Sequence, residues 1–302
     1  MTTIEYRPYD ERVPDEQYKR SLGYILDHGE LAQETAQGVG AITYIAPPPM
    51  HFDLSNGIPL ITERKIGFWK KPIAEILAFV KGKRTLTELE EEGCNFWTPW
   101  ATRAKCESMG LESGDLGPGS YGAAFHDFPK QDGATFNQFQ HLVTQIKEYP
   151  WARTHFVTPW IPYLIGRGGH QKAVVSPCHG WIHCRVIDKK LTLHVYQRSA
   201  DFPVGVPSNM IQYAALTLMI AQVTGLKAHR FVHSFSDAHI YTSTNPEEDQ
   251  VPAVREMLQR AAKRLPTLIV DPNVTDLFEF KEDDFSIMDY EPHPSMQIPV
   301  AV

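Results

Sequence analysis

A long apolar segment in the second half of the chain constrains the fold more than any other feature. Residues 208–224 contain no charged side chain. Pro207 stands directly before them, where proline fits the first turn of a helix. Gly225 follows them, as a glycine does at the C-terminal cap of a helix. The sequence therefore predicts one helix whose apolar composition places it near the core.

Shorter elements precede and follow this helix. The spacing of apolar and turn residues predicts further helices at about residues 15–29, 72–82, 86–92, 135–148 and 247–263. Strand-like segments cover about residues 40–53, interrupted at Pro47 to Pro49, and then 153–160, 173–187, 190–198 and 228–242. Helices and strands mix without strict alternation, which indicates the α+β class with a large mixed sheet and flanking helices. Residues 1–14 are predicted to form a polar tail, and residues 15–302 one domain.

Charge and cysteine content exclude several classes of protein. The net charge is -7, from 29 basic and 36 acidic residues, so we expect no nucleic-acid polymer as a partner, although a local basic pocket for one phosphate remains compatible. The four cysteines form no C-x-x-C pair and are predicted to be reduced thiols of a cytoplasmic protein. The N-terminus has no apolar signal core, and no apolar run reaches the roughly 20 residues that span a bilayer, so we expect a soluble protein without membrane contact.

Cys178 is a candidate nucleophile. Pro177 interrupts the pairing of a strand and exposes the residue after it, and a thiol whose pKa is lowered by cations can attack an electrophile. The alternative is a small buried residue. A metal site is a third interpretation, because His179, His183 and Cys184 lie close by in the sequence. On a strand the cysteines would point to one face and the histidines to the other, so they could not converge on one zinc ion, and no metal is expected.

Two further polar segments flank the apolar helix. Arg198 offers a forked cation for a phosphate, and Ser199 a hydroxyl donor. Asp201 and Asn209 are also polar groups close to a predicted core, where they need partners, and a ligand is one such partner. The alternative for the Arg-Ser pair is ordinary surface chemistry.

The segment from Phe231 to Tyr241 adds a third group. By strand alternation, Asp237, His239 and Tyr241 share one face. Together they can form several hydrogen bonds to sugar hydroxyls. The alternative is a strand with a polar face.

In combination these segments resemble the thymidylate synthase family. The matching motifs are Pro177-Cys178-His179 for the cysteine, Gln197 to Asp201 for phosphate, Gly205 to Asn209 for uracil, Asp237 to Tyr241 for the sugar, and Ile298 to Val302 for the C-terminal lid. The similarity runs from about residue 17 to the last residue, with an unmatched stretch near 161–172. It implies a thymidylate synthase-like single domain that pairs through its sheet into a homodimer.

The resemblance also implies a reaction. Cys178 would attack C6 of dUMP, and C5 would then take a one-carbon unit from the co-substrate 5,10-methylenetetrahydrofolate, giving dTMP and dihydrofolate. Arg198 would bind phosphate and lower the pKa of Cys178. Glu75 matches the glutamate that moves protons through ordered water, and Tyr121 matches the tyrosine that assists proton removal at C5.

Other matched positions would bind substrate and folate. The resemblance assigns the nucleotide to Arg153, Gln197, Ser199, His239 and Tyr241, and the folate to Trp97, Asp201, Gly205 and Val302. Asn209 would read the base, because a carboxamide can donate to O4 and accept from N3–H of uracil. Family members that act on deoxycytidylate tend to carry Asp there, so dUMP is favoured.

The sequence departs from the family around the phosphate. The family's homodimer lends a phosphate-binding arginine across the interface, a position that Arg153 matches, but the usual second arginine is Thr154 here. The loop at residues 33–40 also lacks the expected arginine. Each charge-assisted hydrogen bond to the phosphate contributes roughly 1.5–3 kcal/mol to binding, so another cation is needed in place of the missing arginines. Arg167, His170 or Lys172, in the unmatched stretch, is the hypothesised substitute.

Two other functions remain open from the sequence. A dUMP or dCMP hydroxymethylase would add water to the same intermediate; Trp97 and the complete C-terminus favour a dry site and a methyl product, whereas Ser208 beside Asn209 and the missing arginines indicate divergence. A catalytically inactive relative that binds nucleotide or regulates RNA is the other alternative. The joint presence of Cys178, Arg198, Asn209 and Glu75 argues against it.

Overall fold

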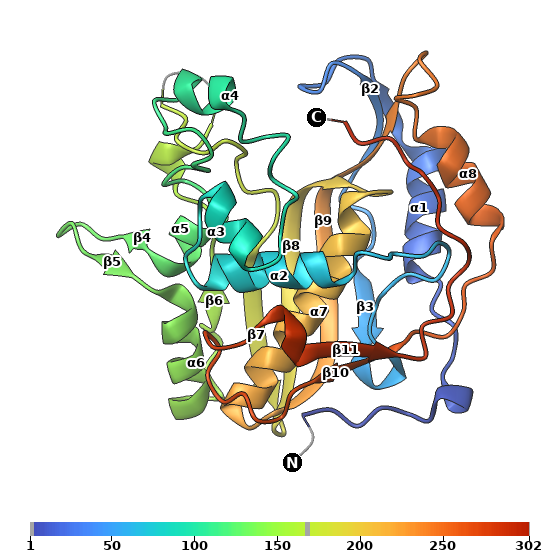
Figure 1. Ribbon diagram of the computed structural model, residues 1–302. Helices are drawn as coiled ribbons and strands as arrows, with labels where there is room; N and C mark the ends of the chain where they lie inside the picture. Colours follow the sequence, from blue (N-terminus) through green and yellow to red (C-terminus); the bar gives the residue numbers. More distant parts are fainter. Residues whose placement is uncertain (1–2, 167–169, 302) are drawn as a thin grey trace.

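A large mixed sheet forms the framework of the protein, as the sequence predicts. The computed structural model describes residues 3–166 and 170–301 (Figure 1). The sheet has seven strands in the order β1–β2–β9–β8–β7–β6, and β3 also pairs with β9. Its strands are β1 (Glu30–Ala32), β2 (Gly40–Ile45), β3 (Met50–Asp53), β6 (Phe156–Val157), β7 (Trp181–Ile187), β8 (Lys190–Asp201) and β9 (Lys227–Thr242). β8 and β9 are parallel, and the other pairs are antiparallel.

Helices and two small hairpins complete the α+β fold. The helices are α1 (Gln17–His28), α2 (Lys70–Val80), α3 (Leu86–Glu91), α4 (Arg103–Ser108), α5 (Tyr121–His126), α6 (Gln138–Glu148), α7 (Gly205–Thr224) and α8 (Val251–Gln259). The hairpins pair β4 (Phe128–Pro129) with β5 (Thr135–Phe136), and β10 (Thr267–Val270) with β11 (Phe285–Met288). Within residues 3–166 and 170–301, no helix combines the length and apolar character needed to cross a membrane.

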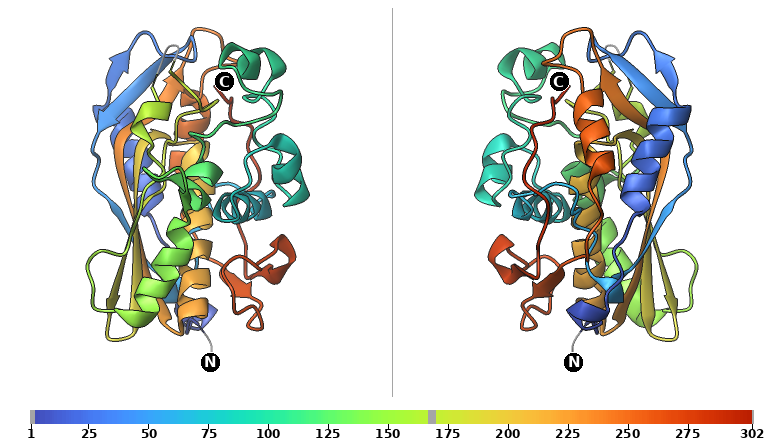
Figure 2. Two further views of the ribbon diagram at one scale, coloured as in Figure 1. Left: turned by 90° about the vertical axis from the view of Figure 1, so that its left-hand side faces the viewer. Right: turned by 90° about the vertical axis from the view of Figure 1, so that its right-hand side faces the viewer.

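The apolar helix α7 lies at the centre of the molecule. Figure 2 shows the sheet at one side, α7 against it, and α2 beyond α7. Nearly every α7 side chain is buried, which explains why the segment carries no charge. Gly225 ends the helix in the left-handed conformation with φ 69°, which confirms the predicted cap.

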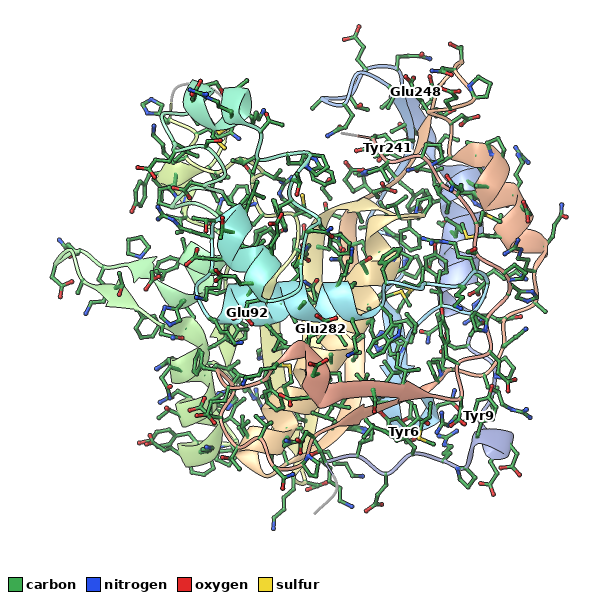
Figure 3. The ribbon with its side chains drawn as sticks, in the orientation of Figure 1. Tyr6, Tyr9, Glu92, Tyr241, Glu248 and Glu282 are labelled. Atoms are coloured by element: carbon green, nitrogen blue, oxygen red, sulfur yellow. The ribbon has the colours of Figure 1, made fainter. Side chains whose placement is uncertain are left out.

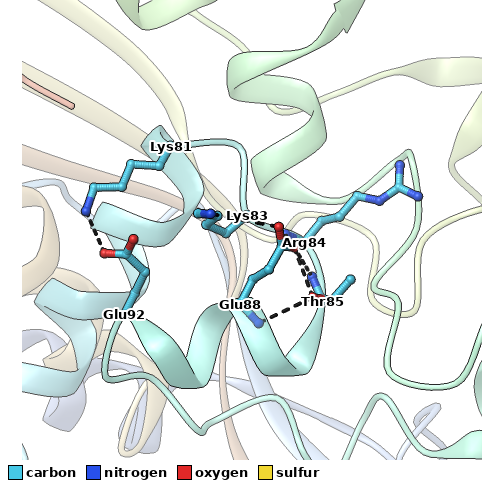
Figure 4. A network of polar contacts seen from close by, with 6 residues as sticks. All are labelled: Lys81, Lys83, Arg84, Thr85, Glu88 and Glu92. Atoms are coloured by element: carbon cyan, nitrogen blue, oxygen red, sulfur yellow. Dashed lines mark hydrogen bonds and ion pairs between the residues drawn. The ribbon is translucent and has the colours of Figure 1, made fainter. Parts of the chain in front are cut away.

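A compact polar network holds α3 against the end of α2 (Figure 4). Thr85 caps α3 by accepting from the Glu88 N–H, and Glu88 accepts in return from the Thr85 N–H. The Lys81 ammonium donates to the Glu92 carboxylate at 2.6 Å. The reciprocal capping of Thr85 and Glu88 confirms the predicted start of the helix after Thr85. The Lys81–Glu92 ion pair connects this helix to the end of α2, the helix that carries Glu75.

The N-terminal segment is polar but packs on the body of the protein. The Tyr6 hydroxyl donates to the Leu268 carbonyl of β10 at 2.9 Å (Figure 3). Arg12 is only 4% exposed, and it donates to the Leu265 carbonyl at 2.9 Å. Hydrogen bonds therefore attach residues of the predicted polar tail to the rest of the protein.

Several predicted element boundaries were wrong. The strand predicted over residues 173–187 begins only at Trp181, because Pro177 and Gly180, which has φ 98°, prevent regular pairing before it. α6 begins at Gln138, since Thr135–Phe136 pairs with β4 instead. α8 begins at Val251, four residues after the predicted start at residue 247.

Candidate active site

The matched motifs meet where β8 and β9 end. Because these strands are parallel, their carboxyl ends lie at the same edge of the sheet. Ser199 is the register partner of Asp237, and Asp201 is the register partner of His239. Asp237 Oδ1 accepts from the Thr43 hydroxyl and lies 3.3 Å from His239 Nδ1. Two motifs far apart in sequence thus become one polar surface.

Cys178 lies beside Arg198, just before β7. The Cys178 Sγ is 3.6 Å from Arg198 Nη2. The guanidinium also donates to the carbonyls of Pro177 and Ser176, both at 2.8 Å, so its position is fixed. Burial raises the pKa of the Cys178 thiol, and the charge of Arg198 opposes that shift. The predicted effect of Arg198 therefore has the expected direction, but desolvation outweighs it in this chain alone.

The segment of Cys178 and His179 is not a strand, contrary to the prediction from which a zinc site was excluded. Cys178 and His179 precede β7, so strand alternation does not set their directions. His179 Nδ1 is 2.5 Å from the Tyr213 hydroxyl oxygen, and burial lowers the pKa of His179 to about 3, which keeps its ring neutral. Among the residues that the structure describes, no three His, Cys, Asp or Glu side chains are grouped so as to hold a metal.

Tyr121 is held against the backbone of the cysteine. Its hydroxyl oxygen accepts from the N–H groups of Cys178 and His179, at 2.6 and 3.3 Å. Its ring stacks on Phe79 and His179, with centroids 4.8 and 4.6 Å apart. Burial raises the pKa of Tyr121 well above its usual value, so the phenol stays protonated and its own O–H remains free to donate.

Glu75 points from α2 into the interior. Its Oε1 accepts from the indole N–H of Trp97 at 2.7 Å, and its Oε2 accepts from Gln212 Nε2 at 2.8 Å. Burial raises the pKa of Glu75 to about 7, although both hydrogen bonds oppose the shift. Trp97, assigned to the folate by resemblance, therefore uses its polar edge to hold this carboxyl group.

Asn209 is held by two glutamines. Gln197 Nε2 donates to Asn209 Oδ1 at 3.1 Å, and Asn209 Nδ2 donates to Gln212 Oε1 at 3.1 Å. Gln197 Oε1 in turn lies 2.9 Å from His233 Nε2. Gln197 is buried, so it supports Asn209 and faces the core, whereas the resemblance assigned it to the nucleotide.

Asp201 connects the strand ends to the C-terminal segment. Its carboxylate accepts from the Val204 N–H and from Gln250 Nε2, both at 3.3 Å. Gln250 Nε2 also donates to the Pro299 carbonyl at 2.9 Å, which attaches the C-terminal segment here at Pro299. Burial raises the pKa of Asp201 to about 6. A Cβ added at Gly205 would lie 3.9 Å from Asn209 Oδ1, so this glycine keeps the surface between the two side chains open.

Some predicted residues lie elsewhere or are already engaged. Arg153 is exposed ahead of β6, at the edge of the sheet. The Lys172 ammonium donates to the Met109 carbonyl, whereas His170, another of the hypothesised phosphate cations, is exposed. Arg167 and Val302 fall outside the described residues. Tyr241 ends the polar face of β9, and its backbone N–H donates to Gln250 Oε1 at 2.9 Å.

Three polar residues of this site were not predicted from the sequence. Gln212 and Tyr213 lie within the apolar α7, and Gln250 immediately precedes α8. An amide three residues after Asn209 in an otherwise apolar helix is a signal that could have identified Gln212, because a buried amide requires partners.

A comparison with known families agrees with this geometry. The family model described as thymidylate synthase matches residues 16–302. The match includes every element from α2 to α8 that contributes a side chain to the site.

Proposed function

Because the chain belongs to the thymidylate synthase family, we propose that it transfers a one-carbon unit from 5,10-methylenetetrahydrofolate to C5 of dUMP, giving dTMP and dihydrofolate. Family membership itself supports folate-dependent one-carbon transfer in nucleotide biosynthesis. The observation that carries the finer proposal is the Cys178 thiol 3.6 Å from the guanidinium of Arg198, with Tyr121 hydrogen-bonded to the same backbone.

Cys178 is the proposed nucleophile. Its sulfur forms a bond to C6 of the pyrimidine, and the electrons of the C5–C6 double bond move toward O4, which makes C5 nucleophilic. Burial disfavours a thiolate at this position, so the attack depends on the positive charge of Arg198. Release of the C6–S bond at the end of the reaction restores the thiol.

Tyr121 and Glu75 are the proposed proton-handling residues. Removal of the C5 proton requires a base near Cys178. The Tyr121 hydroxyl, 2.6 Å from the Cys178 nitrogen, stays protonated and would assist by orienting the water that takes this proton. A carboxyl group with a pKa of about 7 can hold or release a proton at neutral pH. Glu75 would exchange that proton with O4 through water.

The nucleotide is proposed to lie along the ends of β8 and β9. Arg198 and Ser199 would bind phosphate, and His239 and Tyr241 would bind the deoxyribose. Asn209 has one N–H and one oxygen lone pair free beyond its bonds to Gln197 and Gln212. That pair of groups complements O4 and N3–H of uracil.

The folate would supply the one-carbon unit and the reducing equivalent for a methyl product. Its proposed binding groups are Trp97, Asp201, Gly205 and Val302. The buried Asp201 carboxylate accepts hydrogen bonds from Val204 and Gln250 and still has lone pairs that can accept others. These lone pairs suit the N–H groups of a pterin ring. Docking of the C-terminal segment through Gln250 would exclude water and favour the methyl product over a hydroxymethyl product.

A homodimer is proposed to form through the face of the sheet turned away from α7. Tyr196 and Phe156 on that face are 38% and 51% exposed. Trp181 packs edge-on against Tyr196, with ring centroids 5.7 Å apart. A patch of this kind favours association, and Arg153 would be donated to the phosphate site of the partner.

The nucleophile can be tested with 5-fluoro-dUMP and the folate. Fluorine cannot leave C5 as a proton does, so the wild type should form a covalent complex that denaturing mass spectrometry detects. Cys178→Ser should form none and should lose turnover by at least about a thousandfold, while Cys184→Ala, which alters a buried thiol of β7, should form the complex normally. Nucleotide binding without a covalent complex would instead indicate a binding protein.

The product distinguishes the two enzymatic alternatives. Mass spectrometry of the reaction with dUMP should give dTMP. A product carrying 5-hydroxymethyl would assign the protein to the hydroxymethylases and reject the methyltransferase.

A further inference from the structure

A one-way chain of hydrogen bonds runs through the core from β9 to α2. His233 Nε2 lies 2.9 Å from Gln197 Oε1, and the chain then passes through the amides of Asn209 and Gln212 to the carboxylate of Glu75. In each amide the oxygen faces back toward His233 and the nitrogen faces onward toward Glu75.

The two ends of this chain determine its direction. An ionised Glu75 can only accept, so Gln212 must turn its NH₂ group toward it and its oxygen toward Asn209. Asn209 must then donate to Gln212 and accept from Gln197. At the other end His233 is neutral because burial lowers its pKa well below the usual value, so it has a single ring N–H. That hydrogen must be on Nε2, which agrees with the absence of a partner at His233 Nδ1 within the described residues.

Gln212 and His233 cannot meet a ligand themselves, while Gln197 keeps only 3% of its surface exposed. Asn209 and Glu75 keep 7% and 8% of their surfaces exposed, whereas Gln212 and His233 are both 0% exposed. Gln212 can therefore act on a base only through its neighbours.

We propose that Gln212 is a positioning residue that sets the orientation of the Asn209 carboxamide from the carboxylate of Glu75, and that it thereby makes the site select uracil over cytosine. This role, which rests on the proposed function, follows from the one N–H and the one oxygen lone pair of Asn209 that remain for a ligand. With its oxygen on the Gln197 side and its nitrogen on the Gln212 side, the free N–H and lone pair have fixed places. Reversing the amide would exchange them, and the exchanged pattern suits the N4–H₂ and N3 of cytosine.

Substituting Gln212 with Met tests this role directly. Gln212→Met keeps the length of the side chain but removes both hydrogen bonds, so only Gln197 still favours the observed orientation of Asn209, and the reversed orientation costs less free energy. The preference for dUMP over dCMP, measured as a ratio of kcat/KM and as a ratio of dissociation constants, should fall by about tenfold or more. A general loss of packing would lower kcat/KM and weaken binding equally for both substrates, so it would leave these ratios unchanged.

Two further variants provide controls. Gln222→Met lies in the same helix and loses bonds to the carbonyls of Asp271 and Val274, at 2.8 and 2.7 Å, so it should reduce stability without altering either ratio. Gln212→Glu should retain the preference, since its carboxyl group can accept from Asn209 and share a proton with Glu75. Two adjacent carboxyl groups hold that proton to higher pH, so the pH profile of kcat should move upward.

The outcomes separate this role from the proposed function. If wild-type protein converts dUMP but Gln212→Met keeps the full preference, the positioning role is wrong and the function stands. If wild-type protein does not convert dUMP, the function is wrong, and the ratio of dissociation constants still decides whether Gln212 sets base selection. Loss of preference in Gln222→Met equal to that in Gln212→Met would also reject the role.

Discussion

Glu75 shows how burial of one carboxyl group can serve chemistry at the expense of stability. Desolvation raises its pKa to about 7, while the bonds from Trp97 and Gln212 lower it without cancelling the shift. The unfolded chain releases this proton near the ordinary glutamate pKa of 4.5. Between these two pH values the folded protein keeps a proton that the unfolded chain has lost, so the contribution of Glu75 to stability decreases as pH rises.

The Glu75→Gln variant should reveal this contribution. Below pH 4.5 the wild-type carboxyl is protonated in both states, so its ionisation does not affect stability. As pH rises from 4.5 to 8, the free energy of unfolding of Glu75→Gln should increase relative to the wild type by about 3 kcal/mol. Urea unfolding at a series of pH values measures the difference. A difference that stays constant with pH would contradict the raised pKa, and the variant should also lose turnover.

Single residues could be predicted from the sequence when they belonged to a recognisable motif. Cys178, Arg198 and Asn209 stood in short motifs, and the structure brings Cys178 to Arg198 as expected. Gln212 had no motif, and its partner Glu75 lies 137 positions away in sequence, so no local pattern could reveal the pair. Lys172 was a plausible phosphate cation by charge alone, but its ammonium is engaged by a backbone carbonyl.

Helix α7 was predictable as an element because its apolar composition and its two ends agree. Gly225 adopts φ 69° after the helix, and an added Cβ would meet nothing within 4 Å there. Only backbone strain therefore penalises a side chain at this position. The starts of β7 and α8 were predicted less well. Pairing with β8 decides where β7 begins, and Gln250, which is bonded to Tyr241 and Asp201, directly precedes α8.

Replacing Gly225 should isolate that strain. Gly225→Ala should lower the free energy of unfolding by about 1 kcal/mol, because a Cβ disfavours the left-handed region. Gly67 provides a matched control, since its Cβ would also meet nothing within 4 Å but its φ is not positive. Gly67→Ala should therefore leave stability within about 0.5 kcal/mol of the wild type. Equal effects in the two variants, measured by thermal or urea unfolding, would reject the strain argument.

At the scale of the whole molecule, the two faces of the sheet differ in what covers them. α7 covers one face, with α2 beyond it, and among residues 3–166 and 170–301 no helix lies over the other face (Figure 2). That other face presents Tyr196 and Phe156, which are 38% and 51% exposed. The sequence predicted a mixed sheet but could not show which face remains open, because that depends on how distant strands pair. If this face joins two copies, each phosphate site would contain Arg153 of the other copy, and neither subunit would be complete alone.

Mixing two variants that are each impaired at a different residue should test this sharing of sites. Arg153→Ala should weaken phosphate binding and Cys178→Ser should abolish attack, each in both sites of its own homodimer. When equal amounts are unfolded and refolded together, half of the dimers should be mixed. One site in each mixed dimer would combine an intact Cys178 with an intact Arg153 from the partner, so about a quarter of wild-type activity should return. A double variant carrying both changes, refolded with wild type, controls for refolding yield. If the mixture stays as inactive as its components while light scattering shows dimers, Arg153 does not act across the interface.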